Sequence, residues 1–278
     1  MAVRKRALPE GWYPASEADC RRQIRVFTEG FHVPEGRWIG GVAPHAGWYF
    51  SGKAAAKVVS TLAASWQPDR VVLYGGHLPA GRKPIAYMDD SWETPFGPQP
   101  LDTEFSRRLV ETGHAAAAPR GFEDNTVEIL LPFVRYFFGD VPVLAVHSPA
   151  SADALSLAEA VMAELAGTSL TAVFIGSADL THYGPNYGFS PKGSGVSAVE
   201  WVKDENDRSL IDKALELDVT GLLADADKRR NTCSAGPIAS VAASTAKLGV
   251  TRGRLLDYYT SYDVMPNSSF VGYAAIIY

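Results

Sequence analysis

The chain has 278 residues, of which 46% are hydrophobic and 21% charged, as in a folded protein with a sizeable core rather than a disordered segment. Its 26 Lys and Arg against 31 Asp and Glu give a net charge of −5, which does not favour a nucleic-acid surface. The two cysteines, Cys20 and Cys233, argue against a disulfide framework and exclude a closed cysteine-rich zinc site. Histidine must therefore supply most ligands of any transition-metal site.

The beginning of the chain does not resemble a targeting segment. Arg4, Lys5 and Arg6 are basic, but Pro9 and Glu10 follow them where a signal peptide would have an apolar run. No stretch approaches the roughly 18 apolar residues of a membrane helix. We therefore expect a cytoplasmic protein that binds neither membranes nor nucleic acid.

Short apolar runs alternate with longer amphipathic stretches, which predicts an α/β fold in which helices flank a central sheet. The runs that predict strands are 39–43, 70–74, 141–146, 171–175, 255–260 and 269–278. The stretches that predict helices are 53–64, 102–112, 128–138, 152–165, 204–226 and 237–248. Pro132 lies inside one of these helices, and Asp102 is a candidate N-cap of another. No linker or internal repeat is evident, so we expect a single domain over residues 1–278.

Three of the six histidines follow predicted strands. His45 lies in Ala-Pro-His-Ala-Gly, His77 in Gly-Gly-His-Leu-Pro and His182 in the segment 176–184. Open α/β sheets bind ligands at the carboxyl ends of their strands. These histidines are therefore candidate site residues, and Asp179 could orient the imidazole of His182.

The remaining histidines and the cysteines have simpler interpretations, with one exception. His32, His114 and His147 are interpreted as ordinary loop residues, and Cys20 as a buried small apolar residue. Cys233 precedes the helix predicted from Pro237, where a thiolate is favoured as a metal ligand or nucleophile. The Gly- and Ser-rich stretch 184–197 is interpreted as a surface loop, with a mobile lid as the alternative.

Several familiar catalytic motifs are missing from the sequence. It contains no Walker loop, no G-x-G-x-x-G, no H-E-x-x-H, no C-x-x-C and no G-x-S-x-G. Nucleotide-dependent, zincin-type and α/β-hydrolase chemistry therefore have no local support.

Six motifs in order resemble the Memo family, whose bacterial and archaeal members are called AmmeMemoRadiSam system protein B. The segment Ala43–Gly52 is close to A-P-H-A-G-Y-x-Y-S-G, and Ser177–Gly184 is close to S-S-D-L-S-H-Y-G. The other four are Gly11–Pro14, Gly75–His77, Glu128–Phe133 and Cys233–Ile238. The resemblance covers nearly the whole chain.

This resemblance implies a fold similar to that of class III extradiol ring-cleaving dioxygenases, which use non-haem Fe(II). Transferred by motif, it implies His45, His77 and Cys233 as metal ligands. His182 would be the acid or base, with Asp179 beside it. Two departures concern the pocket: Asn125 replaces a histidine of the family, and Ser234 and Ala235 replace Gly and Arg.

The resulting expectation is a metal-dependent redox enzyme that acts on a small aromatic or phenolic substrate with O₂. Fe(II) is the expected cofactor, with copper as the alternative, and a homo-oligomer is left open. Two alternatives are a non-catalytic adaptor that binds metal or phosphorylated peptides, for which Arg82 and Lys83 are nearby cations, and a Cys-His hydrolase with Cys233 as nucleophile and His182 as base. Candidate substrate-pocket residues are Trp12, Tyr49, Asn125, Glu128 and Tyr183.

Overall fold

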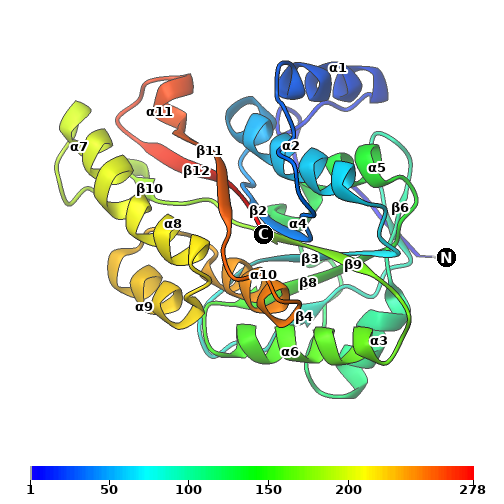
Figure 1. The fold of residues 1–278 in the computed structure, drawn as a ribbon. Coiled ribbons are helices and arrows are strands. Elements are labelled where there is room, and N and C mark those ends of the chain that lie inside the picture. Colours follow the sequence, from blue (N-terminus) through cyan, green and yellow to red (C-terminus); the bar gives the residue numbers. More distant parts are fainter. Residues whose placement is uncertain (1) are drawn as a thin grey trace.

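A computed structural model describes residues 2–278 of the chain (Figure 1). The strands are β1 Val3–Arg4, β2 Gly40–Ala43, β3 Arg70–Leu78, β4 Ile85–Ala86, β5 Ser91–Trp92, β6 Gln99–Pro100, β7 Ala116–Ala117, β8 Val143–Pro149, β9 Ala172–Ser177, β10 His182–Tyr183, β11 Arg254–Thr260 and β12 Phe270–Ile277. The α-helices are α1 Glu17–Thr28, α2 Trp48–Ser65, α3 Thr103–Glu111, α4 Asn125–Glu128, α5 Leu131–Phe138, α6 Asp153–Ala166, α7 Val196–Trp201, α8 Asp207–Leu215, α9 Val219–Arg229, α10 Ala235–Lys247 and α11 Ser261–Val264. A 3₁₀ turn (η1 Pro185–Tyr187) and a π-helical turn (η2 Val202–Asn206) complete the elements.

A mixed sheet forms the centre of the molecule, with the strand order β10-β12-β2-β9-β3-β8-β4-β7. Strand β11 also pairs with β12, outside this order. The inner strands β2, β9, β3 and β8 are parallel to one another, whereas β12 runs antiparallel to β2. These inner strands are short apolar runs that are buried along almost their whole length, as strands covered on both faces should be. The predicted α/β class is therefore confirmed.

Helices cover both faces of this sheet (Figure 1). On one face, α2 packs with α1 and α5 against side chains such as Leu73 and Ile175. On the other face, α10 and α6 pack against alternate residues of the same strands, such as Val72 and Phe174. The two faces follow from the strand period of two residues. None of the helices in residues 2–278 is both long and apolar enough to cross a membrane.

The helices differ from the sequence expectation at four places. The helix predicted over 204–226 is divided, because Leu217 has φ 55° and Asp218 caps α9 by accepting a hydrogen bond from the Gly221 amide. The helix predicted over 128–138 is likewise two helices, with Pro132 in the first turn of α5. The helix α2 begins at Trp48, five residues before the predicted start, and α1 was not predicted.

Strand β3 also continues beyond its predicted end at Tyr74. Gly76 has φ 113°, and the pairing with β8 shifts between Gly75 and Leu78. This irregularity interrupts the regular ladder without ending the strand, as a β-bulge does. Gly76 is also required for space, because a Cβ there would lie 2.9 Å from Nδ1 of His147. The next residue is His77, which therefore lies at the irregular carboxyl end of the central strand β3.

Candidate metal centre

Three donor atoms from three separate segments meet at the carboxyl edge of the parallel strands. They belong to His45, His77 and Cys233, and all lie within 4.8 Å of one another. His45 Nε2 lies 3.2 Å from His77 Nε2 and 3.3 Å from Cys233 Sγ. The structure thus brings together the three residues that the family resemblance implied as ligands.

The topology explains this convergence. His45 comes two residues after β2, and His77 is the penultimate residue of β3, and both strands run parallel to β9. Cys233 precedes α10, whose first turn lies against the ends of β8 and β9. Parallel strands end at the same edge of a sheet, so these segments share one location although they are far apart in sequence.

The Ser177 side chain, held by the backbone carbonyl of Thr126, fixes the orientation of the His45 ring. Ser177 Oγ donates its single proton to the Thr126 carbonyl over 2.6 Å and lies 3.0 Å from His45 Nδ1. Because that hydroxyl proton is already used, the serine oxygen accepts from Nδ1–H of His45. The lone pair of Nε2 is then left for a metal.

A carboxylate holds the His77 ring in the same way. Asp124 Oδ2 lies 3.0 Å from His77 Nδ1, and Thr126 donates to Asp124 Oδ1 through its amide at 2.8 Å and also through its hydroxyl. Burial raises the pKa of Asp124, but hydrogen bonds with His77 and Thr126 outweigh burial and hold this pKa well below its usual range. The ionised carboxylate therefore accepts from Nδ1–H, and Nε2 of His77 faces Nε2 of His45.

The cluster is electrostatically suited to a cation. Burial lowers the pKa of His77, but hydrogen bonds with Asp124 and Cys233 raise it to about 10 overall. Burial raises the pKa of the Cys233 thiol, yet the charge of His45 and hydrogen bonds with the surrounding histidines move it well below its usual range. The Cys233 thiolate and the carboxylates of Asp124 and Asp179 thus favour positive charge between them. Protons or a bound metal can supply that charge.

The donor set also fits a metal geometrically. Two ring nitrogens with lone pairs facing each other at 3.2 Å need a proton or a cation between them. Ligand atoms about 2.0–2.3 Å from one metal lie about 3.0–3.6 Å apart at angles near 90–110°. The observed separations of 3.2 and 3.3 Å fall within this range. Two imidazoles and a thiolate suit iron, copper or zinc and leave open coordination positions.

His182 and Asp179 lie beside this cluster. Asp179 Oδ1 accepts from the His45 amide at 2.7 Å, and Asp179 Oδ2 lies 3.9 Å from His182 Nε2. That nitrogen is buried and has no hydrogen-bond partner among residues 2–278. Burial lowers the pKa of His182, but interactions with Asp179 and Cys233 raise it to about 10 overall. His182 therefore carries a proton at neutral pH.

A cavity of about 400 Å³ opens onto the cluster from the side of His45, His77 and His182. Among the candidate pocket residues, Trp12 and Asn125 line it, and Asn125 also donates to the His45 carbonyl at 3.0 Å. The other apolar walls come from residues that were not predicted, namely Phe50, Tyr187, Val271 and Tyr273. The volume suits a ligand with one aromatic ring.

Three candidate pocket residues lie elsewhere, so their placement in the substrate pocket is corrected. Glu128 is buried and accepts hydrogen bonds from the amides of Ala7 and Leu8 and from Tyr13, which anchors the N-terminal segment. Tyr183 is also buried, and its hydroxyl donates to the Gly193 carbonyl. Tyr49 is exposed.

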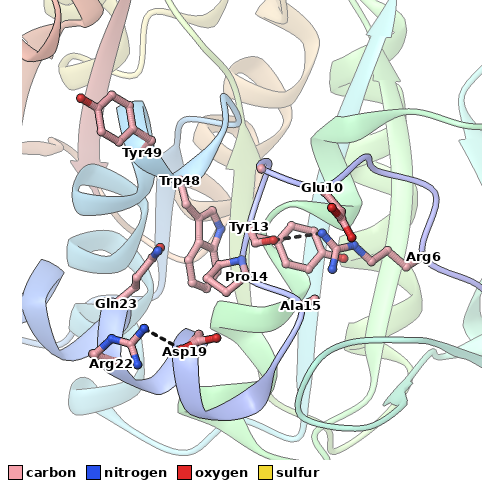
Figure 2. A pocket seen from close by; sticks show the side chains of 11 residues that line it. Arg6, Glu10, Tyr13, Pro14, Ala15, Asp19, Arg22, Gln23, Trp48 and Tyr49 are labelled. Atoms are coloured by element: carbon pink, nitrogen blue, oxygen red, sulfur yellow. Dashed lines mark hydrogen bonds and ion pairs between the residues drawn. The ribbon is translucent and has the colours of Figure 1, made fainter.

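The hollow that Tyr49 lines is shown in Figure 2 and lies between the N-terminal segment, α1 and α2. Its two arginines are already paired, since Arg6 donates to the Tyr13 carbonyl and Arg22 forms an ion pair with Asp19. Within residues 2–278, the only cluster of donors with metal-binding spacing is the one at His45, His77 and Cys233.

The other histidines are placed as ordinary residues, with one addition. His32 and His114 are exposed. His147 is buried, lies 3.0 Å from the Tyr87 hydroxyl and stands 3.8 Å from Asp124, directly behind the carboxylate that holds His77. Burial is the largest cause that lowers its pKa to about 4, so it stays neutral.

The supporting residues Ser177, Thr126 and Asp124 were not predicted for these roles. Ser177 and Asp124 lie inside or beside the motifs that resemble the Memo family. This position was the only feature of the sequence that could have pointed to them. Their partners are about 50 residues away or more in the sequence.

Comparison with known proteins shows the family of the chain. A family model described as Memo-like protein matches residues 4–277. The chain belongs to the Memo family. A MEMO1 family protein of Methanosarcina acetivorans is 33% identical over 100% of this chain and 99% of its own length. A MEMO1 family protein of Methanopyrus kandleri is 32% identical over 86% of this chain and 82% of its own length.

A further Memo relative and one solved structure complete the comparison. The MEMO1 family protein of Pyrobaculum aerophilum is 30% identical over 100% of this chain and 99% of its own length. The solved structure, an uncharacterized protein of Escherichia coli K12, covers 79% of this chain and 91% of its own, with 15% identity and a TM-score of 0.44. The Memo assignment rests on the family model and the relatives.

Proposed function

We propose that this Memo protein is a non-haem iron enzyme that uses O₂ on a small aromatic or phenolic substrate. The observation that carries the proposal is the convergence of His45, His77 and Cys233, with both Nδ1 atoms occupied by hydrogen bonds and the two Nε2 atoms 3.2 Å apart. Fe(II) in such a site would bind O₂ and a phenolic oxygen at its open positions. Copper is compatible with the same donor set.

The protein's own contribution would be substrate placement and proton transfer. The aromatic residues Trp12, Phe50, Tyr187 and Tyr273 line the cavity and can hold a planar ring beside the metal ligands. His182 lines the same cavity, and the Nε2 atom of its ring has no hydrogen-bond partner within residues 2–278. It can therefore protonate a substrate oxygen, whereas Asp179 positions the ring and stabilises its charged form.

Metal content in a pair of cysteine variants tests the ligand set. Fe(II) is added to anaerobic protein, excess metal is removed on a desalting column, and iron per chain is measured. We expect about one iron in the wild type and almost none in Cys233→Ala. Cys20→Ala is the matched control, since it removes the other thiol, which is buried in α1 and donates to the Pro14 carbonyl. Full iron content in Cys233→Ala would overturn the proposal.

Oxygen uptake tests the reaction itself. Fe(II)-loaded protein is mixed with a panel of catechols, and consumption of O₂ is followed with an electrode. We expect uptake with at least one catechol and loss of uptake in His182→Gln with iron content unchanged. Tight iron binding without uptake across the panel would favour the adaptor instead.

The low pKa of the thiol also fits a Cys-His hydrolase, which is the second candidate. Cys233 Sγ lies 3.3 Å from His45 Nε2, close enough for proton transfer, so His45 could act as the base in place of His182, the base expected from the sequence. A Cys-His mechanism needs only one imidazole, whereas two imidazoles face each other at the thiolate. The second imidazole has no role in a hydrolase, which makes this candidate the weaker one. A hydrolase would act without metal, so activity of chelator-treated protein that alkylation of Cys233 abolishes would favour it.

A further inference from the structure

A second cavity of about 400 Å³ lies on the other side of His182 and Tyr187 and reaches Cys233. It shares His182 and Tyr187 with the first cavity, and the rings of these two residues are 4.8 Å apart. A ligand bound at the metal cluster would therefore have space on both sides of this pair. The first cavity is bounded mainly by aromatic and small polar side chains, whereas the second contains a cation.

That cation is Arg230, at the C-terminal end of α9. Arg230 has φ 53°, an uncommon conformation for a residue other than glycine, and its amide donates to the Ala226 carbonyl to close the helix. Its guanidinium lies 4.9 Å from the centre of the Phe189 ring, in the loop that follows His182. The helix end and this aromatic contact together hold the guanidinium at the wall of the cavity.

The charge of Arg230 is available to a ligand. Its neighbour Arg229 forms an ion pair with Asp225 at 3.0 Å, but Arg230 has no ion pair or side-chain hydrogen bond within residues 2–278. Thr232, which also lines the cavity, already donates its hydroxyl proton to the Asp179 carbonyl. Arg230 therefore offers this cavity a free guanidinium for charge-assisted hydrogen bonds.

We infer that Arg230 recognises a carboxylate of the substrate, so that the substrate class is a small aromatic carboxylate. The inference rests on the proposed function, which places the aromatic ring of the substrate beside the metal ligands. The assignment of a carboxylate on that substrate rests on Arg230 alone. A guanidinium offers two parallel N–H donors that match one carboxylate. A doubly charged phosphate is less suited, because Asp227 lines the same cavity and, apart from the imidazole of His182, Arg230 is the only lining residue that can carry positive charge.

Binding to metal-free protein tests this inference separately from iron and O₂. Dissociation constants of 4-hydroxybenzoate, phenol and phenyl phosphate are measured by NMR titration under reducing conditions at low ionic strength. We expect 4-hydroxybenzoate to bind the wild type about tenfold more tightly than phenol. Arg230→Asn, which keeps a residue that tolerates positive φ, should remove this difference and leave phenol binding unchanged.

Two further variants sharpen the test. Lys228→Gln is the matched control, because it removes one exposed, unpaired charge from the same helix outside the cavity and should change no constant. Asp227→Asn should act in the opposite direction to Arg230→Asn and tighten 4-hydroxybenzoate binding. Thermal melting of each variant shows whether it is folded.

Three outcomes would overturn the inference. The first is an unchanged preference for 4-hydroxybenzoate in Arg230→Asn, and the second is no preference in the wild type. The third is Arg230-dependent binding of phenyl phosphate that is tighter than that of 4-hydroxybenzoate. Failure of iron binding in the wild type with a preserved Arg230 effect would instead refute the proposed function alone.

Discussion

At the scale of single residues, Thr126 connects the supports of both histidines of the candidate metal centre. Its carbonyl accepts from Ser177, which holds His45, and its amide and hydroxyl donate to Asp124, which holds His77. Its hydroxyl oxygen also accepts from the Gly76 amide at 2.6 Å, next to His77. One buried residue on the short helix α4 thus sets the orientation of two imidazoles.

This arrangement predicts that Ser177→Ala weakens metal binding although the ligands stay in place. Without the serine oxygen, the His45 ring loses the acceptor that keeps the proton on Nδ1. We expect the affinity for Fe(II) to fall about 10- to 100-fold, the usual effect of removing a hydrogen-bond partner of a ligand. Competition with a chromophoric chelator under anaerobic conditions measures the change.

The control is Ser240→Ala, which removes a hydroxyl that is equally buried but bonds to Ser148 and the Ala154 carbonyl. It should leave the Fe(II) affinity of the protein unchanged. Equal loss of affinity in both variants would mean that a general loss of stability, not the orientation of His45, is responsible.

At the scale of elements, the sequence predicted the parts of the fold that depend on local patterns. The four central strands are continuous apolar runs, and Asp102 caps α3 as expected, with its side chain accepting from the Phe105 amide. The histidines after the strands were found because strand ends are visible in the sequence. The residues that hold these histidines could not be found in this way, because Ser177 and Thr126 meet only through the tertiary fold.

The element that places Cys233 depends on close contact with the sheet. In the first turn of α10, a Cβ on Gly236 would overlap the carbonyl oxygens of Ser148 and Pro149, at the end of β8. On the facing strand, a Cβ on Gly176 would lie 2.6 Å from the Pro237 carbonyl oxygen. Residues without side chains thus let the helix approach the strand ends, and Cys233 comes near the histidines for this reason.

Gly236→Ala should therefore destabilise the fold and disturb the metal centre together. The added methyl group must push the start of α10 from backbone atoms that cannot move aside easily. We expect a loss of about 1–3 kcal/mol in the free energy of unfolding and weaker Fe(II) binding. Urea denaturation and the chelator competition measure the two effects.

Gly167→Ala is the comparison for the same chemical change at an open position. It ends α6 with φ −73°, and a Cβ there would lie 3.5 Å from the Glu164 carbonyl oxygen, an ordinary contact. We expect about 0.4–1 kcal/mol of stabilisation and no change in Fe(II) affinity. Unaltered stability of Gly236→Ala would contradict the close-contact explanation.

At the scale of the whole molecule, the candidate metal centre lies where the central sheet meets a layer built from the C-terminal half of the chain. Strand β10, which carries His182, pairs with β12 at one end of the sheet order. Asp207, the first residue of α8, is buried beneath this region and accepts from the Thr181 amide at 3.0 Å and from the Tyr258 hydroxyl at 2.7 Å. A buried carboxyl thus joins α8, β11 and the segment before His182.

This carboxyl predicts how the stability of the molecule depends on pH. Burial is the largest cause that raises the pKa of Asp207, from 3.8 to about 6. The folded state therefore binds its proton more tightly than the unfolded state does. The resulting stabilisation is fully present below pH 3.8 and is lost as the pH rises through about 6.

Comparison of the wild type with Asp207→Asn isolates this contribution, because the amide cannot ionise. Between pH 5 and pH 7, the free energy of unfolding of the wild type should fall by about 1 kcal/mol relative to that of the variant. Asp212→Asn, on the same helix, is the control. Its carboxylate is 45% exposed and pairs with Arg208, so its difference from the wild type should be nearly constant over this range. Urea denaturation at both pH values measures all three proteins, and a constant difference for Asp207→Asn would show that burial does not hold the proton on this carboxyl.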